Sequence, residues 1–289
     1  MVNTGILLAL ISAGVYGVRE IYQKETVVQT DEWVASWAKR FISAIFALPA
    51  LYFFGIPDTN WWAITPYLIV GVVISFIATV LISKAYKHEE VSFLAPLGAL
   101  SPVPVLLTEP LILGEYPSLL GILGVLIIVA GVYLLKIDGA TTLSEPVKRI
   151  ATNRAAQLLM LVTLMYSITA NFDSIGVEYS SAVMWVVLTS GFTGLLLTPV
   201  MMYKTENWKQ EISDAGTPLV LFGGLSALGL ILQMAALEYT LVVYVSAVKR
   251  LSIPVSVILA FVLYNETNIR GRTIGTILTV TGAIFIAMA

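Results

Sequence analysis

The class of this protein is decided by the stretch Asn60–Ser83, NWWAITPYLIVGVVISFIATVLIS, which contains no charged residue. At about 1.5 Å of rise per residue, a helix of this length crosses the hydrocarbon layer of a bilayer, which is about 30 Å thick. Ser180–Tyr203 and Thr217–Leu237 are also free of charge. Of all 289 residues, 58% are hydrophobic and 12% are charged, against about 25% charged in a typical soluble domain. The sequence therefore predicts a multi-pass integral protein of the cell membrane.

Charged residues and turn-like stretches divide the rest of the chain into similar runs. None shows the alternation of an outer-membrane barrel strand, and a backbone facing lipid must satisfy its hydrogen bonds within its own segment. We therefore expect an all-α integral membrane protein with ten transmembrane helices. The predicted spans are Thr4–Tyr22, Trp33–Phe53, Asn60–Ser83, Val91–Leu113, Gly121–Leu135, Ala155–Phe172, Ser180–Tyr203, Thr217–Leu237, Leu241–Tyr264 and Thr273–Ala289.

One long polar segment, Lys136–Arg154, interrupts this pattern, with five predicted spans on each side. We expect a first five-helix repeat over residues 1–137, a linker over 138–153 and a second five-helix repeat over 154–289. Because five is an odd number, the second repeat would enter the membrane upside down relative to the first. Inverted repeats of this kind are a recurring transporter architecture, with a central cavity between the halves.

The two halves also match in sequence at a nearly constant offset. Both contain a Glu followed by two glycines at the same spacing, and such small residues let membrane helices approach closely. Tyr16 matches Tyr166 at an offset of 150, and Glu115, Gly124 and Gly131 match Glu266, Gly275 and Gly282 at an offset of 151.

Further residues in both halves resemble a known family. They are Ala85-Tyr86-Lys87, Ser101-Pro102, Gly114-Glu115, Gly124 and Gly131 in the first half, and Ala236-Leu237, Ser252-Ile253-Pro254, Asn265-Glu266, Gly275 and Gly282 in the second. This pattern is similar to the drug/metabolite transporter (DMT) superfamily, in its EamA-type branch. Arg40-Phe41 resembles an Arg-Phe pair often found in the second helix of that family, whereas Tyr16-Gly17 replaces the common Trp-Gly. The resemblance covers essentially the whole chain and implies ten helices around a central cavity.

The resemblance and the architecture together lead us to expect a secondary-type transporter. It would move small organic metabolites, amino acids or related compounds, by alternating access, with export as the favoured direction. A multidrug or nucleobase/nucleoside carrier of the same fold is an alternative. A channel or membrane scaffold is an alternative from another class, and saturating flux would favour a carrier over a channel.

Composition argues against several other classes. The chain has no cysteine and one histidine, His88, so we expect no metal site and no cofactor. An enzyme is not expected either, because His88 lies near a helix end and the five Asp residues are scattered. The net charge of −2 gives no basic face for nucleic acid. The expected partners are the lipid bilayer and a small-molecule substrate, and the protein is expected to be a monomer or homodimer.

Basic residues inside predicted spans are the strongest candidates for a binding site, because a charge at the bilayer centre costs about 2.5–3.5 kcal/mol on insertion scales. Lys249 and Arg250 lie about two turns inside the ninth span, with Ser246 at helical spacing and Pro254 one turn on. We expect one of the pair to neutralise an anionic group of the substrate, such as a carboxylate. A structural ion pair is the alternative.

The other intramembrane cations are less distinctive. Arg40 and its neighbour Lys39 lie about two turns inside the second span, where a cavity role and snorkelling to the interface are equally consistent with the pattern. Arg19 is expected to snorkel, since Glu20 and Lys24 mark the end of the first span.

Aromatic and amide side chains could line a cavity for an organic substrate. Interfacial belts also collect Trp and Tyr, and an amide can simply bond two helices together. The candidates for cavity lining are Tyr16, Trp37, Tyr166, Trp185 and Gln233.

Ion coupling would require a carboxylate within reach of the cavity. Glu20, Glu109 and Asp173 are the carboxylates closest to span interiors. Each lies near a predicted helix end, so we expect all three to be solvated surface charges.

Orientation receives two conflicting indications. The loops after the odd-numbered spans hold eleven Lys and Arg residues, and the loops after the second, fourth, sixth and eighth hold none. The positive-inside rule therefore places the odd-numbered loops in the cytoplasm and both termini outside. The family resemblance implies cytoplasmic termini. We favour the charge count.

Overall fold

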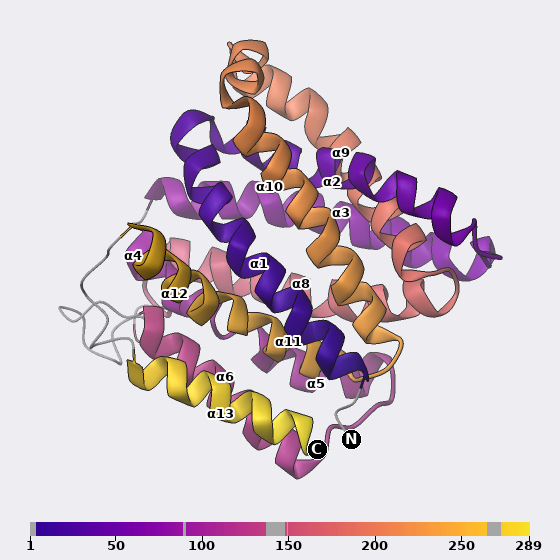
Figure 1. Cartoon of the computed structure of the whole chain (residues 1–289), viewed down its shortest axis with the longest axis vertical. Helices are drawn as coiled ribbons and strands as arrows, with labels where there is room; N and C mark the ends of the chain where they lie inside the picture. The colour runs from indigo at the N-terminus through magenta and orange to yellow at the C-terminus, as the bar shows by residue number, and fades with distance from the viewer. Residues whose placement is uncertain (1–3, 89–90, 137–147, 149, 265–272) are drawn as a thin grey trace.

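The computed structural model describes residues 4–88, 91–136, 148, 150–264 and 273–289, and every regular element in these residues is a helix (Figure 1). The first half contains α1 (Thr4–Gln29), α2 (Glu32–Phe54), α3 (Trp61–His88), α4 (Val91–Gly98), α5 (Pro102–Ile112) and α6 (Leu119–Lys136). The second half contains α8 (Arg154–Glu178), α9 (Ala182–Lys204), α10 (Trp208–Leu237), α11 (Val242–Val248), the 3₁₀ turn η1 (Lys249–Leu251), α12 (Ser252–Tyr264) and α13 (Thr273–Ala287).

Seven segments of the described chain are long and apolar enough to cross a membrane. They are Thr4–Gln29, Glu32–Phe53, Trp61–Ala85, Arg154–Glu178, Ala182–Lys204, Trp208–Leu237 and Val242–Ala260. Three shorter apolar helical segments, Pro96–Ile112, Leu119–Leu135 and Thr273–Ala287, accompany them. Several helices run further than the sequence predicted; among them, α1 reaches Gln29 instead of Tyr22, and α8 reaches Glu178 instead of Phe172. As a result, Arg19 and Asp173 lie inside helices and not at their ends.

The fourth predicted span of each half is not one continuous helix. In the first half, turn residues at 99–101 separate α4 from α5, and Pro102 begins the second piece. In the second half, the 3₁₀ turn η1 separates α11 from α12, which contains Pro254. Proline removes a backbone donor and disfavours a helical conformation of the residue before it, so both breaks have a local cause.

The last helices of the two halves, α6 and α13, pack side by side (Figure 1). A Cβ added to Gly124 would lie 2.7 Å from the carbonyl oxygen of Gly282, and one added to Gly131 would lie 2.7 Å from that of Gly275. Residue numbers therefore fall along α13 as they rise along α6, which makes the crossing antiparallel. Exchanging the two halves turns one contact into the other, as expected for repeats related by a two-fold axis.

The second helices of the halves cross in the same manner. Gly194 of α9 lies against Phe41 of α2, since an added Cβ would be 2.8 Å from the Phe41 Cα, and Gly191 lies against Ala44. Phe41 and Gly191 are sequence counterparts, as are Ala44 and Gly194, so this contact is also symmetric. The packing of α1 on α10 has its counterpart in the packing of α3 on α8.

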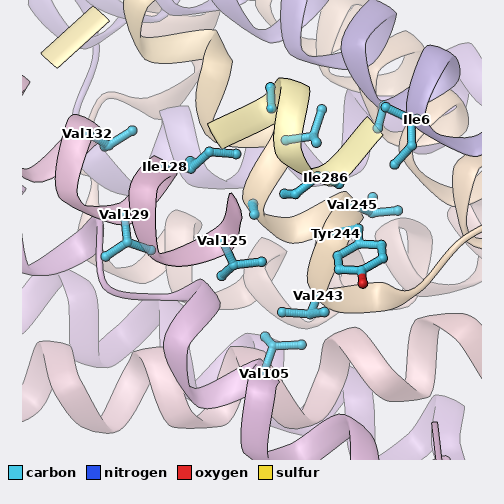
Figure 2. Close-up of a cluster of buried hydrophobic side chains, with 14 of the residues drawn as sticks. Ile6, Val105, Val125, Ile128, Val129, Val132, Val243, Tyr244, Val245 and Ile286 are labelled. Carbon is cyan, nitrogen blue, oxygen red and sulfur yellow. The ribbon is translucent and has the colours of Figure 1, made fainter. Parts of the chain in front are cut away.

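A hydrophobic cluster holds α6 and α13 against the rest of the bundle (Figure 2). Val125, Ile128 and Val132 of α6 meet Ile286 of α13 there. Residues of α11 complete the cluster, which positions this short half-helix at the side of the cavity described below.

Candidate functional site

A cavity of about 350 Å³ lies between the two halves. The first half lines it with side chains from α1, α2, α3 and α5. The second half lines it with side chains from α8, α9, α10, α11 and η1. Binding sites for small molecules have volumes of this order and combine apolar walls with a few polar groups. The space is therefore suited to a small ligand.

Five basic residues of the described chain line this cavity. They are Arg19 of α1, Lys39 and Arg40 of α2, and Lys249 and Arg250 of η1. The parts of α1, α2 and η1 that carry these residues lie inside apolar segments, where an uncompensated charge is costly. Arg19 was expected to snorkel, and that prediction is wrong, because the longer α1 places it beside the cavity.

The ring of Tyr16 connects two of these cations. The Arg19 guanidinium carbon lies 4.8 Å from the ring centroid and the Lys249 ammonium nitrogen 4.7 Å from it. The Tyr16 hydroxyl donates to the side-chain carbonyl of Gln233 at 3.1 Å. Gly229 makes room for the ring, since a Cβ there would lie 2.7 Å from it. Tyr16 thus holds a cation of the first half beside a cation of the second.

Arg250 links the two helix breaks. Its guanidinium donates to the hydroxyl of Ser101, the turn residue that precedes α5. Its Nε is buried without a hydrogen-bond partner, and the same holds for the Nε of Arg19. A buried guanidinium N–H without an acceptor is unfavourable, so both arginines have donor capacity left for an anionic ligand.

Asp173 is the one carboxylate among the described residues that line the cavity. Its Oδ1 accepts the indole N–H of Trp185 at 2.7 Å. Trp185 is 1% exposed and its ring lies over Gly176, where a Cβ would come within 2.2 Å of it. Asp173 was expected to be a solvated surface charge, and that prediction is wrong because α8 continues past it.

The other two carboxylates considered for coupling are also not free surface charges. The Ser252 hydroxyl donates to Glu20 at 3.0 Å, which ties α1 to the start of α12. Glu109 is 0% exposed, and its two oxygens accept the backbone N–H groups of Val242 and Val243 at 2.6 and 3.0 Å. The prediction of a solvated carboxylate is wrong for Glu109, because α11 of the other half covers it. Glu20 is half-buried.

The predicted binding residues are mostly brought together. Those that line the cavity are Tyr16, Arg40, Tyr166, Trp185, Gln233, Ser246, Lys249 and Arg250. Trp37 is the exception: its indole N–H donates to Thr198 at 3.1 Å and its ring stacks on Phe41, with centroids 5.2 Å apart. Trp37 therefore contributes to the α2–α9 contact. The role of the other eight in substrate binding stays a prediction.

The charge of the cavity does not follow the repeat. At an offset of 150, Arg19 corresponds to Thr169, Lys39 to Thr189 and Arg40 to Ser190. Thr169 and Thr189 also line the cavity. At these three positions the first half carries a basic side chain and the second half a small hydroxyl side chain. The sequence alignment of the halves contained this signal.

No cluster of His, Cys, Asp and Glu that could hold a metal ion occurs in the part of the chain that the structure describes.

These features define a multi-pass helical membrane protein whose two similar halves enclose a cationic cavity. The model of the EamA-like transporter family matches residues 3–137 and, a second time, residues 153–288. The chain belongs to this family, which confirms the resemblance noted in the sequence. A solved crystal structure of a protein with 14% sequence identity has a TM-score of 0.78 and covers 97% of this chain and 95% of its own. At that identity the likeness shows the fold alone. No protein of curated function matches the sequence significantly.

Proposed function

We propose that the protein is a secondary-type carrier that moves a small organic metabolite with an anionic group across the membrane by alternating access. Membership of a transporter family supports transport as the activity. The observation that carries the anionic group is the presence of five basic side chains around one cavity. Amino acids and related compounds carry such a group, and export is the direction that we expect from the resemblance.

We further propose that the three shorter apolar segments also span the bilayer, giving ten transmembrane helices in two inverted repeats. The antiparallel crossings of α6 with α13 and of α2 with α9 support this arrangement, because each pairs equivalent helices. The repeat boundaries would be 1–137 and 154–289 with a linker over 138–153. The two ranges matched by the family model are consistent with these boundaries.

The helix breaks provide a physical basis for alternating access. A 3₁₀ turn in the middle of a helix often marks a hinge, and broken helices line the substrate site in many inverted-repeat carriers. Here η1 carries Lys249 and Arg250, and the break between α4 and α5 carries Ser101. Substrate binding at these residues would act directly on the points where both broken helices can bend.

In this proposal the cavity residues have distinct roles. Lys249, Arg250 and Arg40 bind the anionic group, and Ser246 and Gln233 offer hydrogen bonds to polar groups. Tyr16, Tyr166 and Trp185 provide apolar surface for the uncharged part of the substrate. The aromatic lining, which also includes Phe172, favours a planar substrate such as a nucleobase derivative as a second candidate.

The test is transport by the purified protein in proteoliposomes. Lys249→Gln and Arg250→Gln should each raise the apparent KM for the substrate at least tenfold, since a hydrogen bond to a charged group contributes about 1.5–3 kcal/mol. Lys84→Gln, which changes an exposed residue of α3, serves as the matched control. Flux that rises linearly with concentration would indicate a channel instead. Wild-type KM and rate in both cavity variants would exclude the binding role.

A further inference from the structure

The charge around the cavity exceeds what a singly charged substrate can balance. Among the described residues, five basic side chains line it, and two carboxylates lie near them. Asp173 is in the lining itself, and Glu20 follows Arg19 on α1 and accepts from Ser252, two residues after Arg250. Basic groups therefore outnumber carboxylates by three among the described residues around the cavity. In a low-dielectric surrounding such charges repel one another more strongly than in water.

Both carboxylates already have other hydrogen-bond partners. Asp173 accepts from Trp185 at 2.7 Å, and Glu20 accepts from Ser252 at 3.0 Å. These contacts hold the two carboxylates on α8 and α1, and an anionic occupant of the cavity would balance the remaining basic groups.

We propose that the transported substrate is a compact oxyanion with at least two negative charges, of the dicarboxylate or phosphate-monoester type. This inference rests on the proposed carrier function and specifies its substrate class. A zwitterionic amino acid adds a carboxylate and an ammonium group together, so it leaves the charge imbalance as it was. A doubly charged anion removes most of the imbalance.

The free donors support the same class of ligand. The unpartnered Nε atoms belong to Arg19 and Arg250, one from each half of the molecule. Arginine binds carboxylate and phosphate oxygens through several N–H groups in one plane. The second nitrogen that Arg250 would use is partly committed to Ser101, which fixes the orientation of its guanidinium. An anion with several charged oxygens can accept from both arginines and so connect the halves.

Tyr16 holds two of the basic side chains beside the cavity. Its ring contacts Arg19 and Lys249 from within the bundle, which offsets part of their repulsion. The cavity volume of about 350 Å³ limits the ligand to a small molecule.

The test compares ligands of similar size that differ in net charge, using full-length purified protein in detergent. Succinate is paired with succinamate, its monoamide, and glycerol 3-phosphate with glycerol, with alanine as the zwitterion. At a pH of about 7.5 the phosphate monoester is close to doubly charged, since its second pKa is about 6. Binding is measured by calorimetry and by the rise in melting temperature that a native-state ligand causes.

We expect at least one dianion to bind about tenfold or more tightly than its less charged partner. Whether succinate or glycerol 3-phosphate shows the effect identifies the type of oxyanion. Arg19→Gln and Arg250→Gln should reduce that preference, and Arg250→Lys should restore it in part because it keeps the charge. Lys84→Gln should leave it unchanged. Melting temperatures without ligand identify variants that fail to fold. If Arg250→Gln fails to fold, Arg250→Lys is compared with the parent protein instead.

Three outcomes would overturn the inference. They are a monoanion or alanine that binds as tightly as the dianions, a preference that survives both glutamine substitutions, and no binding of any dianion at millimolar concentration. Transport distinguishes this failure from failure of the carrier. Saturable flux of alanine in proteoliposomes would leave the carrier function intact and reject the dianion. Tight dianion binding without flux would support the dianion as ligand and reject the carrier function.

Discussion

The carboxylate of Glu109 on α5 accepts the backbone N–H of Val242, the first residue of α11, at 2.6 Å. The other carboxylate oxygen accepts the next backbone N–H, that of Val243, at 3.0 Å. The N-cap position of α11, Leu241, offers no side-chain cap, so a carboxylate from the other half of the molecule satisfies the free donors that every helix start leaves. This contact joins α5, the second piece of one broken helix, to α11, the first piece of the other.

Glu109→Gln should destabilise the protein by about 1–3 kcal/mol, because the amide replaces one acceptor with a donor that faces a backbone N–H. Its effect should appear as a lower melting temperature in detergent. Glu115→Gln, an exposed change just beyond the end of α5, should have little effect. Equal melting temperatures for the two variants would show that the cap does not contribute to stability.

The glycines at the α6–α13 crossing should be intolerant of even one added methyl group. In Gly131→Ala the new Cβ would lie 2.5 Å from the Thr279 hydroxyl and 2.7 Å from the Gly275 carbonyl. Overpacking of this kind costs about 1–3 kcal/mol. Gly14→Ala on α1, where no atom lies within 4 Å of the new Cβ, should be neutral or slightly stabilising. Melting temperatures that rank the two variants in the opposite order would contradict the close crossing.

The pair of Trp185 and Asp173 should show energetic coupling. Trp185→Phe removes the donor to the Asp173 carboxylate, and Asp173→Asn removes its charge. A hydrogen bond to a charged group contributes about 1.5–3 kcal/mol, so each single variant should be less stable than the parent protein. The double variant should lose less than the sum of the two. Strict additivity in a double-mutant cycle would indicate that the bond is energetically neutral.

Tyr16 should act through its ring more than through its hydroxyl. Tyr16→Phe keeps the surface that Arg19 and Lys249 contact and loses only the bond to Gln233. Tyr16→Leu removes the ring, and each cation–ring contact contributes about 0.5–2 kcal/mol. In proteoliposomes the apparent KM of the Leu variant should be several-fold higher than that of the Phe variant. Indistinguishable KM values would assign Tyr16 a purely structural role.

Orientation can be tested cleanly because the chain contains no cysteine. The charge count predicts that Glu206→Cys, in the loop after α9, is labelled only from the cytoplasmic side by a membrane-impermeant thiol reagent. Asp58→Cys, in the exposed loop after α2, should be labelled from outside in intact cells. The reverse pattern would support cytoplasmic termini, as the family resemblance implies.

Much of the fold could be predicted from the sequence because lipid leaves the backbone little choice. Each predicted span corresponds to a helix or a broken pair of helices, and the glycines at 124, 131, 275 and 282 mark the α6–α13 contact. The breaks were not predicted as such, although Pro102 and Pro254 were visible. Whether a proline bends a helix or interrupts it depends on what its neighbours offer the freed backbone groups.

The site was predicted less completely. Lys249 and Arg250 stood out because a charge inside an apolar span must face a wet cavity or an acidic partner. Arg19 and Asp173 were misjudged because helix ends were placed by the nearest charge, and charged residues can continue a helix when another helix covers them. Trp37 was selected for its depth, but depth does not tell which face of α2 meets α9.

The sequence by itself determined that this protein lies in lipid, that it contains a repeat, and which basic residues lie in its spans. These follow from hydrophobic length and internal periodicity, which can be read along the chain. Only the tertiary structure decided that the cations of α1, α2 and η1 converge on one cavity, and that Glu109 is hidden beneath α11. Those outcomes depend on how helices from opposite halves cross, which is set by packing between residues more than a hundred positions apart.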